Sequence, residues 1–248
     1  MNITNKTILI TGGGSGIGFE IAKLLSQKGN KVIITGRTEA KLQKAAEQLN
    51  NVSFFATDIN NETDVSSLVA KIKSEFGGLD VLINNAGQAY YYKIIEGTNI
   101  AEKAAHEMQT NYLAPINLTE KFLPLLTASV EAAIVNVTSI VAFVPGINLP
   151  SYAASKAALH SYTQALRYVL AKSTGIKVFE LMPPLVNTEF SAEIGGANGI
   201  PPEEVAQGLI DGFEKDDFEI HVGKTADIYK LFLHSPSEAL NVLNAGRE

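Results

Sequence analysis

The sequence predicts an α/β fold in which a mostly parallel β-sheet is covered by helices on both faces. Short apolar runs rich in β-branched residues alternate with longer segments whose apolar residues recur at helical spacing. Strands separated by helices of this length are typical of βαβ units. The 248 residues are enough for one core, and no linker, repeat or low-complexity tract divides them. We therefore expect a single domain over residues 1–248.

The N-terminal half supplies four predicted strands, each followed by a helix. The first strand, KTILIT, leads through a glycine-rich turn into the helical FEIAKLLSQKG, whose final glycine is typical of a helix C-terminus. The next two strands are KVIIT and VSFFAT, and the helices after them are EAKLQKAAEQL and NETDVSSLVAKIKSEFGG. The fourth strand is LDVLI, and a long helical region follows near residues 101–127.

The C-terminal half continues the same alternation. The strand AAIVNVT precedes a helix from about residue 151 to residue 173, and IKVFEL and FEIHV are the last predicted strands. The least regular segment is EFSAEIGGANGIPP, residues 189–202. Its paired glycines and later Pro-Pro predict a mobile loop on the substrate side.

Composition excludes several kinds of partner and site. The formal net charge is −6 and no basic run occurs, so we expect no nucleic acid partner. There is no cysteine and the four histidines are far apart, so nothing calls for a metal site. No apolar run approaches ~18 residues and the start lacks a signal-peptide pattern, so we expect no membrane span. The expectation is a cytoplasmic enzyme or binding protein.

The turn TGGGSGIG joins the first strand to the first helix and predicts a nucleotide site. Its glycines follow the spacing G-x-x-x-G-x-G. Glycine permits a tight turn and a close approach to phosphate, while the helix N-terminus offers unpaired N–H groups. A glycine-rich turn without a ligand is the alternative. The cofactor contacts expected here are Gly12, Gly14, Ser15, Gly16, Ile17 and Gly18.

Arg37 follows the second strand, at the place where many NAD sites have an acid that binds the ribose 2′-hydroxyl. No acid stands there, and Glu39 begins the next predicted helix. A guanidinium matches a 2′-phosphate in geometry and charge. We therefore predict that NADP(H) is preferred over NAD(H), with a solvated arginine as the alternative.

Tyr152 and Lys156 lie four residues apart on a predicted helix and so share a face. A lysine ammonium and an oxidised nicotinamide both favour the phenolate of a tyrosine, whose ordinary pKa is ~10. Lowering that pKa toward ~7 takes roughly 4 kcal/mol, more than an exposed ion pair supplies, so we expect a partly water-excluded cleft. Tyr152 would then protonate a carbonyl oxygen as hydride reaches its carbon, or deprotonate an alcohol. A surface pair without a role is the alternative.

Ser139 and Asn111 complete the predicted catalytic group. Ser139 ends the strand AIVNVTS, at the sheet edge where α/β proteins bind ligands, and could hold the reacting oxygen. Pro115 has no N–H and crowds the carbonyl of Asn111. The helix should kink there and leave that carbonyl free for a water that relays protons to Lys156. A kinked helix without a proton path is an equal alternative.

Together these motifs resemble the short-chain dehydrogenase/reductase family over nearly the whole chain. The resemblance is carried by TGGGSGIG, TDI, NNAG, and by Asn111, Ser139, Tyr152 and Lys156 in the family's order and spacing. It implies a Rossmann-type doubly wound sheet of about seven parallel strands, a nicotinamide cofactor, and a Ser–Tyr–Lys group assisted by the asparagine. The further cofactor contacts that it implies are Asp58, Ile59, Asn85, Ala86, Gly87, Tyr152, Lys156, Pro183, Val186 and Thr188.

The chain departs from the family pattern after the sixth strand. Pro184 stands where the family has a glycine, and proline restricts φ where glycine is free. This affects the substrate side rather than the chemistry. The segments EAAIVNVTS, PPLVNT and SPSEALNVLN are similar to the DltE-like branch of bacterial oxidoreductases. The family resemblance also implies packing through the two long helices, near 101–127 and 151–173, into a homodimer or homotetramer.

The segments expected to border the substrate are largely apolar or aromatic: residues 140–150, the tyrosines 90–92 and the loop 189–202. They predict a small, moderately apolar ketone, aldehyde or secondary alcohol, although surface packing is an alternative for the tyrosines. Two other functions stay open. The same cofactor could serve imine reduction or dehydration, or the chain could be a non-catalytic NADP(H)-binding regulator. The intact Ser139, Tyr152 and Lys156 argue against the regulator.

Overall fold

The computed structural model describes residues 1–246. Within them one sheet of seven parallel strands has the order β3-β2-β1-β4-β5-β6-β7. The predicted α/β fold with a Rossmann-type doubly wound parallel sheet is confirmed. The strands are β1 (Thr7–Thr11), β2 (Lys31–Gly36), β3 (Val52–Ala56), β4 (Val81–Asn84), β5 (Ala133–Val137), β6 (Lys177–Met182) and β7 (Glu219–His221).

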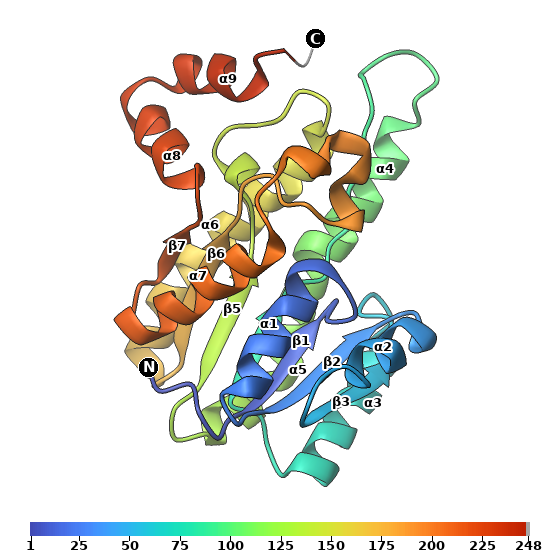
Figure 1. The fold of residues 1–248 in the computed structure, drawn as a ribbon, viewed down its shortest axis with the longest axis vertical. Coiled ribbons are helices and arrows are strands. Elements are labelled where there is room, and N and C mark those ends of the chain that lie inside the picture. Colours follow the sequence, from blue (N-terminus) through green and yellow to red (C-terminus); the bar gives the residue numbers. More distant parts are fainter. Residues whose placement is uncertain (247–248) are drawn as a thin grey trace.

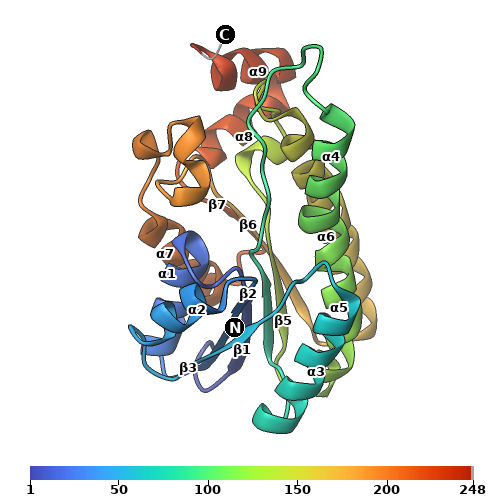
Figure 2. The same cartoon turned by 90° about the vertical axis from the view of Figure 1, so that its right-hand side faces the viewer.

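Helices cover both faces of the sheet, as Figure 2 shows. One face carries α1 (Gly16–Gln27), α2 (Glu39–Ala46) and α7 (Pro202–Lys215). The opposite face carries α3 (Glu62–Phe76), α4 (Ile100–Met108), α5 (Ala114–Ala128) and α6 (Pro150–Ser173). In residues 1–246 no helix combines the length and apolar character that crossing a membrane would require.

Strand side chains alternate between the two helical layers. Ile8 and Ile10 of β1 pack in one core with Leu25 of α1. Leu9, between them, packs in the other core with Phe122 of α5. Successive strand residues point to opposite faces, so a strand covered on both sides reads as a continuous apolar run. This is why the strand predicted at KTILIT contains the uninterrupted apolar run ILI.

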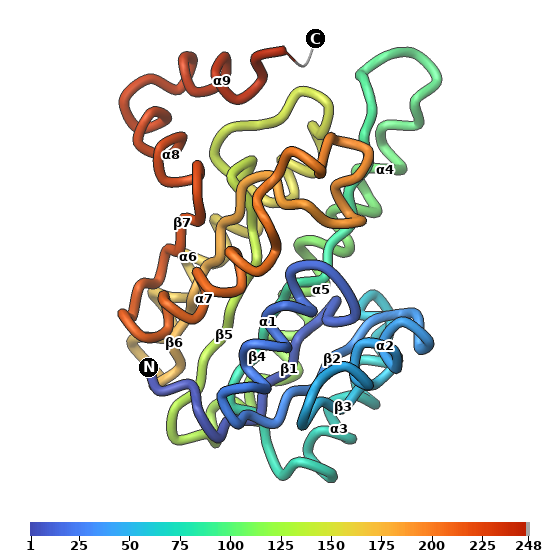
Figure 3. The backbone as a smooth tube through the Cα atoms, viewed as in Figure 1, coloured from blue at the N-terminus to red at the C-terminus, as the bar shows by residue number. Residues whose placement is uncertain are grey.

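The strand order reverses between β1 and β4, which are neighbours in the sheet. In doubly wound sheets ligands bind at the carboxyl ends of the strands, outside such a switch point. The N-terminus lies at the amino ends of the strands, and the C-terminal helices lie at the opposite end, as the tube in Figure 3 shows. The functional site is therefore expected between the β1–α1 turn and the C-terminal helices.

The long helical region after β4 is interrupted where the sequence predicted a kink. Asn111 lies in a π-helical turn, Gln109–Leu113, between α4 and α5. Pro115 supplies no N–H to the carbonyl of Asn111, so the regular α-helical ladder cannot pass this point. The proton-relaying water remains a prediction.

The segment after β6 has more regular structure than its sequence indicates. Two 3₁₀ turns, Glu189–Ile194 and Gly196–Asn198, fill most of the predicted loop. A single β-bridge between Val186 and Ile200 closes its base. The mobility of this segment remains a prediction.

Helices α8 (Thr225–His234) and α9 (Pro236–Asn244) were not predicted from the sequence. They lie at the carboxyl end of the sheet (Figure 1), where the side chain of Asn244 fixes α9 to the segment after β5. Its Nδ2 donates to the carbonyl of Pro145 at 3.0 Å, and its Oδ1 accepts from the N–H of Ile147 at 2.9 Å.

Candidate active site

A cleft of about 690 Å³ runs along the carboxyl ends of the strands. It is bordered by the β1–α1 turn, the ends of β2, β4 and β5, the start of α6 and the segment after β6. The structure thus brings almost all of the predicted site residues to one surface. Those that line the cleft are Gly12, Gly14, Ser15, Gly16, Ile17, Arg37, Asp58, Ile59, Asn85, Ala86, Gly87, Ser139, Tyr152, Lys156, Pro183, Val186 and Thr188.

Helix α1 offers a place for an anion at its start. Its N-cap, Ser15, makes no side-chain cap hydrogen bond, and its first turn contains no acid. Gly12 and Gly16 have φ values of +66° and +54°, which favour glycine. The N–H groups of the first turn are therefore left for a ligand, and the turn fits the pyrophosphate of a dinucleotide.

Gly18 does not line the cleft but allows α1 to pack closely on the turn. A Cβ at Gly18 would come within 2.5 Å of Asn85 Nδ2 and also overlap the carbonyl oxygen of Gly12. Gly13, which the sequence analysis did not single out, is equally restricted, because a Cβ there would lie 2.5 Å from Ile34 Cγ2. Two glycines of this motif thus serve packing rather than the ligand directly.

Two cations lie at the end of the cleft next to β2. Arg37 lines it as predicted, and so does Lys41, which the sequence analysis missed. Lys41 Nζ lies 3.1 Å from the carboxylate of Glu189, so this lysine also joins α2 to the segment after β6. Arg37 precedes α2 and Lys41 lies in its first turn, so the short distance between them in the sequence could have pointed to Lys41 as well.

Ser139, Tyr152 and Lys156 meet at the other end of the cleft. Lys156 is only 3% exposed, and its Nζ donates to the carbonyl of Val137 at 2.8 Å. The same Nζ lies 5.6 Å from the centroid of the Tyr152 ring. The Ser139 hydroxyl is hydrogen-bonded to the Tyr152 phenol and lowers its pKa. The Tyr152 phenol, the Ser139 hydroxyl and the buried Lys156 ammonium therefore share one small volume.

The electrostatics of this pair differ from the expectation. Burial raises the pKa of Tyr152 far above its ordinary value, the negative charge of Glu107 raises it further, and Ser139 only partly opposes them. Burial also lowers the pKa of Lys156 to about 8, against the opposing charge of Glu180. The protein groups alone therefore keep the phenol neutral. An acidic phenol would need the added positive charge of an oxidised nicotinamide.

Asn111 is fully buried and does not line the cleft. Its Oδ1 accepts from the N–H of Gln88 at 2.8 Å, and its Nδ2 donates to the carbonyl of Gln88 at 2.8 Å and to Ser155 Oγ at 2.9 Å. Ser155 Oγ in turn donates to the carbonyl of Tyr152 at 2.7 Å. The side chain of Asn111 thus holds the helix that carries the tyrosine.

The segment after β6 closes over the glycine turn. Pro183 accepts a backbone hydrogen bond from Ile140 at 2.9 Å, which places this segment next to Ser139. Thr188 lies over the β1–α1 turn, where a Cβ at Gly16 would be 3.1 Å from its methyl group. The predicted contacts of this segment are therefore placed at the cleft despite the proline at position 184.

An apolar cluster surrounds the end of the cleft at which Tyr152 lies. Ile140, Val141 and Ala153 form its buried part, and Tyr152 packs against it together with Ile228 of α8 and Leu243 of α9. The sequence analysis missed the last two residues, because no motif links them to the site. In the described part of the chain, the tyrosines at 90–92 do not line the cleft, which favours packing, the alternative that the sequence left open for them.

The fold and the cleft together define a dinucleotide-binding α/β oxidoreductase. Residues 6–198 match the family model described as short chain dehydrogenase. The chain is 40% identical over 225 residues to the uncharacterized oxidoreductase DltE of Bacillus subtilis (strain 168), covering 89% of each. It is 34% identical over 212 residues to an uncharacterized oxidoreductase of Staphylococcus aureus (strain USA300), covering 84% of this chain and 90% of that protein. The chain therefore belongs to the short-chain dehydrogenase family, which confirms the family resemblance.

Solved structures agree with this fold. A short chain dehydrogenase/reductase from Burkholderia phymatum, in complex with NAD, superposes with a TM-score of 0.88 at 21% identity, covering 98% of this chain and 97% of that one. A short chain dehydrogenase from Burkholderia cenocepacia J2315, in complex with NADP, gives a TM-score of 0.85 at 27% identity, covering 98% of both chains.

Proposed function

We propose that this chain is an NADP(H)-dependent oxidoreductase that interconverts a carbonyl compound and a secondary alcohol, with Tyr152 as the general acid and base. One observation carries the proposal. A single cleft has an anion-binding helix start and Arg37 toward one end and Ser139, Tyr152 and Lys156 at the other. A dinucleotide lying along it would bring its nicotinamide to the tyrosine.

In this reaction Ser139, Tyr152 and Lys156 would have separate roles. When bound, the nicotinamide supplies or accepts a hydride. Ser139 donates a hydrogen bond to the carbonyl oxygen, and the Tyr152 phenol passes its proton to that oxygen as the carbon receives the hydride. One C–H bond and one O–H bond form, and the phenolate regains a proton from solvent. In the reverse direction Tyr152 removes the hydroxyl proton, and Lys156 stabilises the phenolate.

The preference for NADP(H) is supported by two cations where the 2′-phosphate would lie. Arg37→Asp should reduce the affinity for NADPH by roughly 10- to 100-fold, because charge-assisted hydrogen bonds are lost. Lys44→Asp makes a comparable charge change on α2, at an exposed side chain away from the cleft, and should leave the affinity within about twofold. Titration of both cofactors measures the effect. Equal NADPH and NADH affinities in the wild type would contradict this preference.

The apolar cluster supports an apolar substrate. Ile140, Val141, Ile228 and Leu243 enclose the side of Tyr152 where the reacting carbon would lie. We propose a ketone, aldehyde or secondary alcohol with an apolar substituent, because burying apolar area against these side chains stabilises the bound substrate.

A homodimer or homotetramer is proposed from exposed apolar side chains on the long helices. Leu113 lies between α4 and α5 and is 47% exposed, and Val169 of α6 is 59% exposed. Contacts through these helices would bury them. Light scattering at micromolar concentration tests this, and a monomer would contradict it.

Oxidation of NADPH over a panel of apolar ketones and aldehydes tests the chemistry, on wild type beside Tyr152→Phe. Phenylalanine keeps the ring but has no proton to transfer, so kcat should fall by roughly 100-fold or more while cofactor affinity changes little. Tyr168→Phe removes an exposed phenol from the same helix and should have no effect. Undiminished turnover in Tyr152→Phe would remove the tyrosine from the mechanism.

A further inference from the structure

Two side chains, one helical turn apart, connect three segments near Tyr152 by hydrogen bonds. One of these side chains is Asn111, which is hydrogen-bonded to the backbone of Gln88 and to the hydroxyl of Ser155. It therefore connects the π turn after α4, the extended segment after β4 and helix α6. This connection belongs to the group that the sequence analysis predicted.

Glu107, one turn earlier on α4, makes the same kind of connection. Its Oε1 accepts from the N–H of Tyr90 at 2.7 Å, and its Oε2 accepts a hydrogen bond from the hydroxyl of Ser151. The Ser151 hydroxyl also lies 2.6 Å from the hydroxyl of Tyr92, which is itself buried. Glu107 is thus a second link between α4, the extended segment and α6.

The spacing of the two links matches the periods of the elements that they join. Glu107 and Asn111 are four residues apart on one helical segment, and so are Ser151 and Ser155 on α6. Along the extended segment the bonded residues are two apart, at positions 88 and 90, which is the strand-like period. Tyr152 directly follows the serine that Glu107 holds. Glu107 therefore acts on the first turn of α6, where Tyr152 lies.

The charge of Glu107 is not needed for these hydrogen bonds. A glutamine could accept from the N–H of Tyr90 and donate to Ser151 with the same shape. Glu107 is fully buried, and it forms no ion pair within residues 1–246. Burying an unpaired carboxylate is costly, and burial raises its pKa although both hydrogen bonds oppose this. The ionised carboxylate also raises the pKa of Tyr152.

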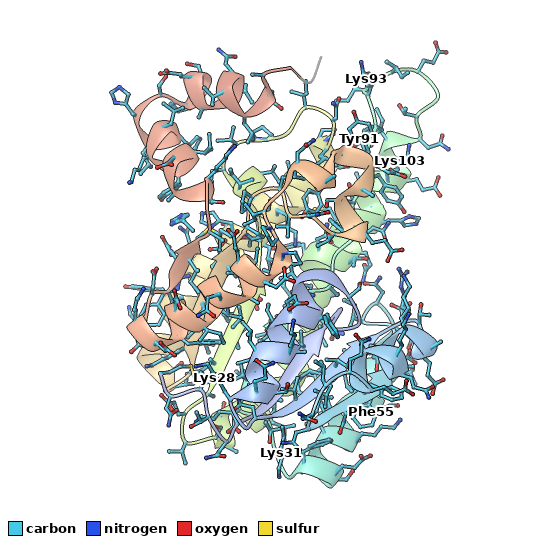
Figure 4. The ribbon with its side chains drawn as sticks, viewed as in Figure 1. Lys28, Lys31, Phe55, Tyr91, Lys93 and Lys103 are labelled. Carbon is cyan, nitrogen blue, oxygen red and sulfur yellow. The ribbon has the colours of Figure 1, made fainter. Side chains whose placement is uncertain are left out.

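Other ionisable groups near this link come from each of the three segments. Lys103 Nζ lies 5.1 Å from the centroid of the Tyr92 ring and donates to the carbonyl of Thr98 at 2.8 Å. Figure 4 labels Lys103 beside Tyr91 at this end of the molecule. The ionisable groups of the three segments include Lys103 and His106 on α4, Tyr90, Tyr91 and Tyr92 on the extended segment, and Tyr152 and Lys156 on α6.

We propose that Glu107 is a positioning residue of the active site, which anchors the first turn of α6 and places a negative charge near the proton-donating phenol of Tyr152. The inference rests on the proposed function of that tyrosine. Its consequence is a bias toward carbonyl reduction at neutral pH, because the carboxylate opposes formation of the phenolate that alcohol oxidation requires.

Two substitutions separate anchoring from charge. Glu107→Gln keeps a hydrogen-bonding side chain of the same shape and removes the charge, so the pH profile of kcat/KM for alcohol oxidation should move to lower pH by about half a unit or more. Ser151→Ala keeps the charge and removes the anchor, so kcat should fall by roughly 10-fold or more with the profile unmoved. Glu102→Gln removes an exposed carboxylate from the same helix and should change neither quantity.

A readout without turnover keeps this inference separate from the proposed function. The tyrosinate absorbance of the NADP⁺ complex is titrated with and without Tyr152→Phe, and the difference gives the titration of Tyr152 alone. The same difference in the Glu107→Gln background should titrate at lower pH. An unmoved titration, or an equal shift in Glu102→Gln, would overturn the inference. If wild type turns over no carbonyl compound, the proposed function fails while the titration still decides the role of Glu107.

Discussion

Helix α6 carries the same pair of residues twice, at its two ends. Tyr152 and Lys156 lie four residues apart near its start, and Tyr168 and Lys172 repeat the spacing near its end. The second pair is exposed, and Lys172 Nζ donates directly to the Tyr168 hydroxyl at 2.7 Å. In the first pair Lys156 is buried and donates instead to the carbonyl of Val137 at 2.8 Å.

The comparison shows that spacing on a helix does not by itself decide the environment of a tyrosine and a lysine. Water competes for both members of the exposed pair and screens the lysine charge, so their direct hydrogen bond contributes little. Burial of the first pair changes the pKa of both members, and Ser139 and the cleft supply the place where a substrate would use them. The environment that distinguishes the two pairs comes from other elements of the fold.

Replacing each lysine by methionine should give the largest difference between the two pairs. Lys156→Met removes the cation next to Tyr152 and should lower kcat by roughly 100-fold or more, since the phenolate loses its stabilising charge. Lys172→Met should leave kcat within about twofold, because an exposed pair is screened. Steady-state NADPH oxidation measures both. Comparable losses in the two variants would mean that burial is not what separates the pairs.

The sequence allowed the fold and the cofactor half of the site to be predicted, because their determinants are local. Each of these features is contained in one short segment. Examples are the apolar run of β1, the glycines of the turn that follows it, and Arg37 directly after β2. The family motifs also separated Tyr152 from Tyr168, which spacing alone could not do.

The remaining features depend on contacts between distant segments. Glu107 is recognisable only once the extended segment and α6 lie beside α4, and Leu243 only once α9 lies over the cleft. The pKa of Tyr152 could not be predicted either. It reflects burial and the charge of Glu107 rather than the lysine on its own helix.

The two lysines should also differ in how they make stability depend on pH. Burial lowers the pKa of Lys156 from 10.5 to about 8 in the folded chain. Between those values the unfolded chain binds the extra proton, so the free energy of unfolding rises with pH from about 8 to 10.5 and levels off below about 8. The contribution of this one group is up to about 3 kcal/mol.

Urea unfolding of the cofactor-free protein between about pH 7 and pH 10 measures this slope. Lys156→Met should lack the part of the rise that Lys156 causes and should be more stable than wild type near neutral pH. Lys172→Met should keep the wild-type slope. A wild-type slope in Lys156→Met would show that the buried ammonium does not titrate in this range.

The smallest expected effect concerns the apolar cluster that packs around Tyr152 and has no counterpart at Tyr168. Leu243 of α9 packs on the cluster around Tyr152, whereas Leu233 of α8 is 66% exposed. Leu243→Ala removes part of the wall, so KM should rise by about 3- to 10-fold for carbonyl compounds with long apolar substituents, at ~0.8 kcal/mol per buried CH₂. It should change little for short ones. Leu233→Ala is the matched control and should leave both unchanged. If KM rose equally for short and long substituents, the leucine would shape the catalytic residues themselves rather than the substrate wall.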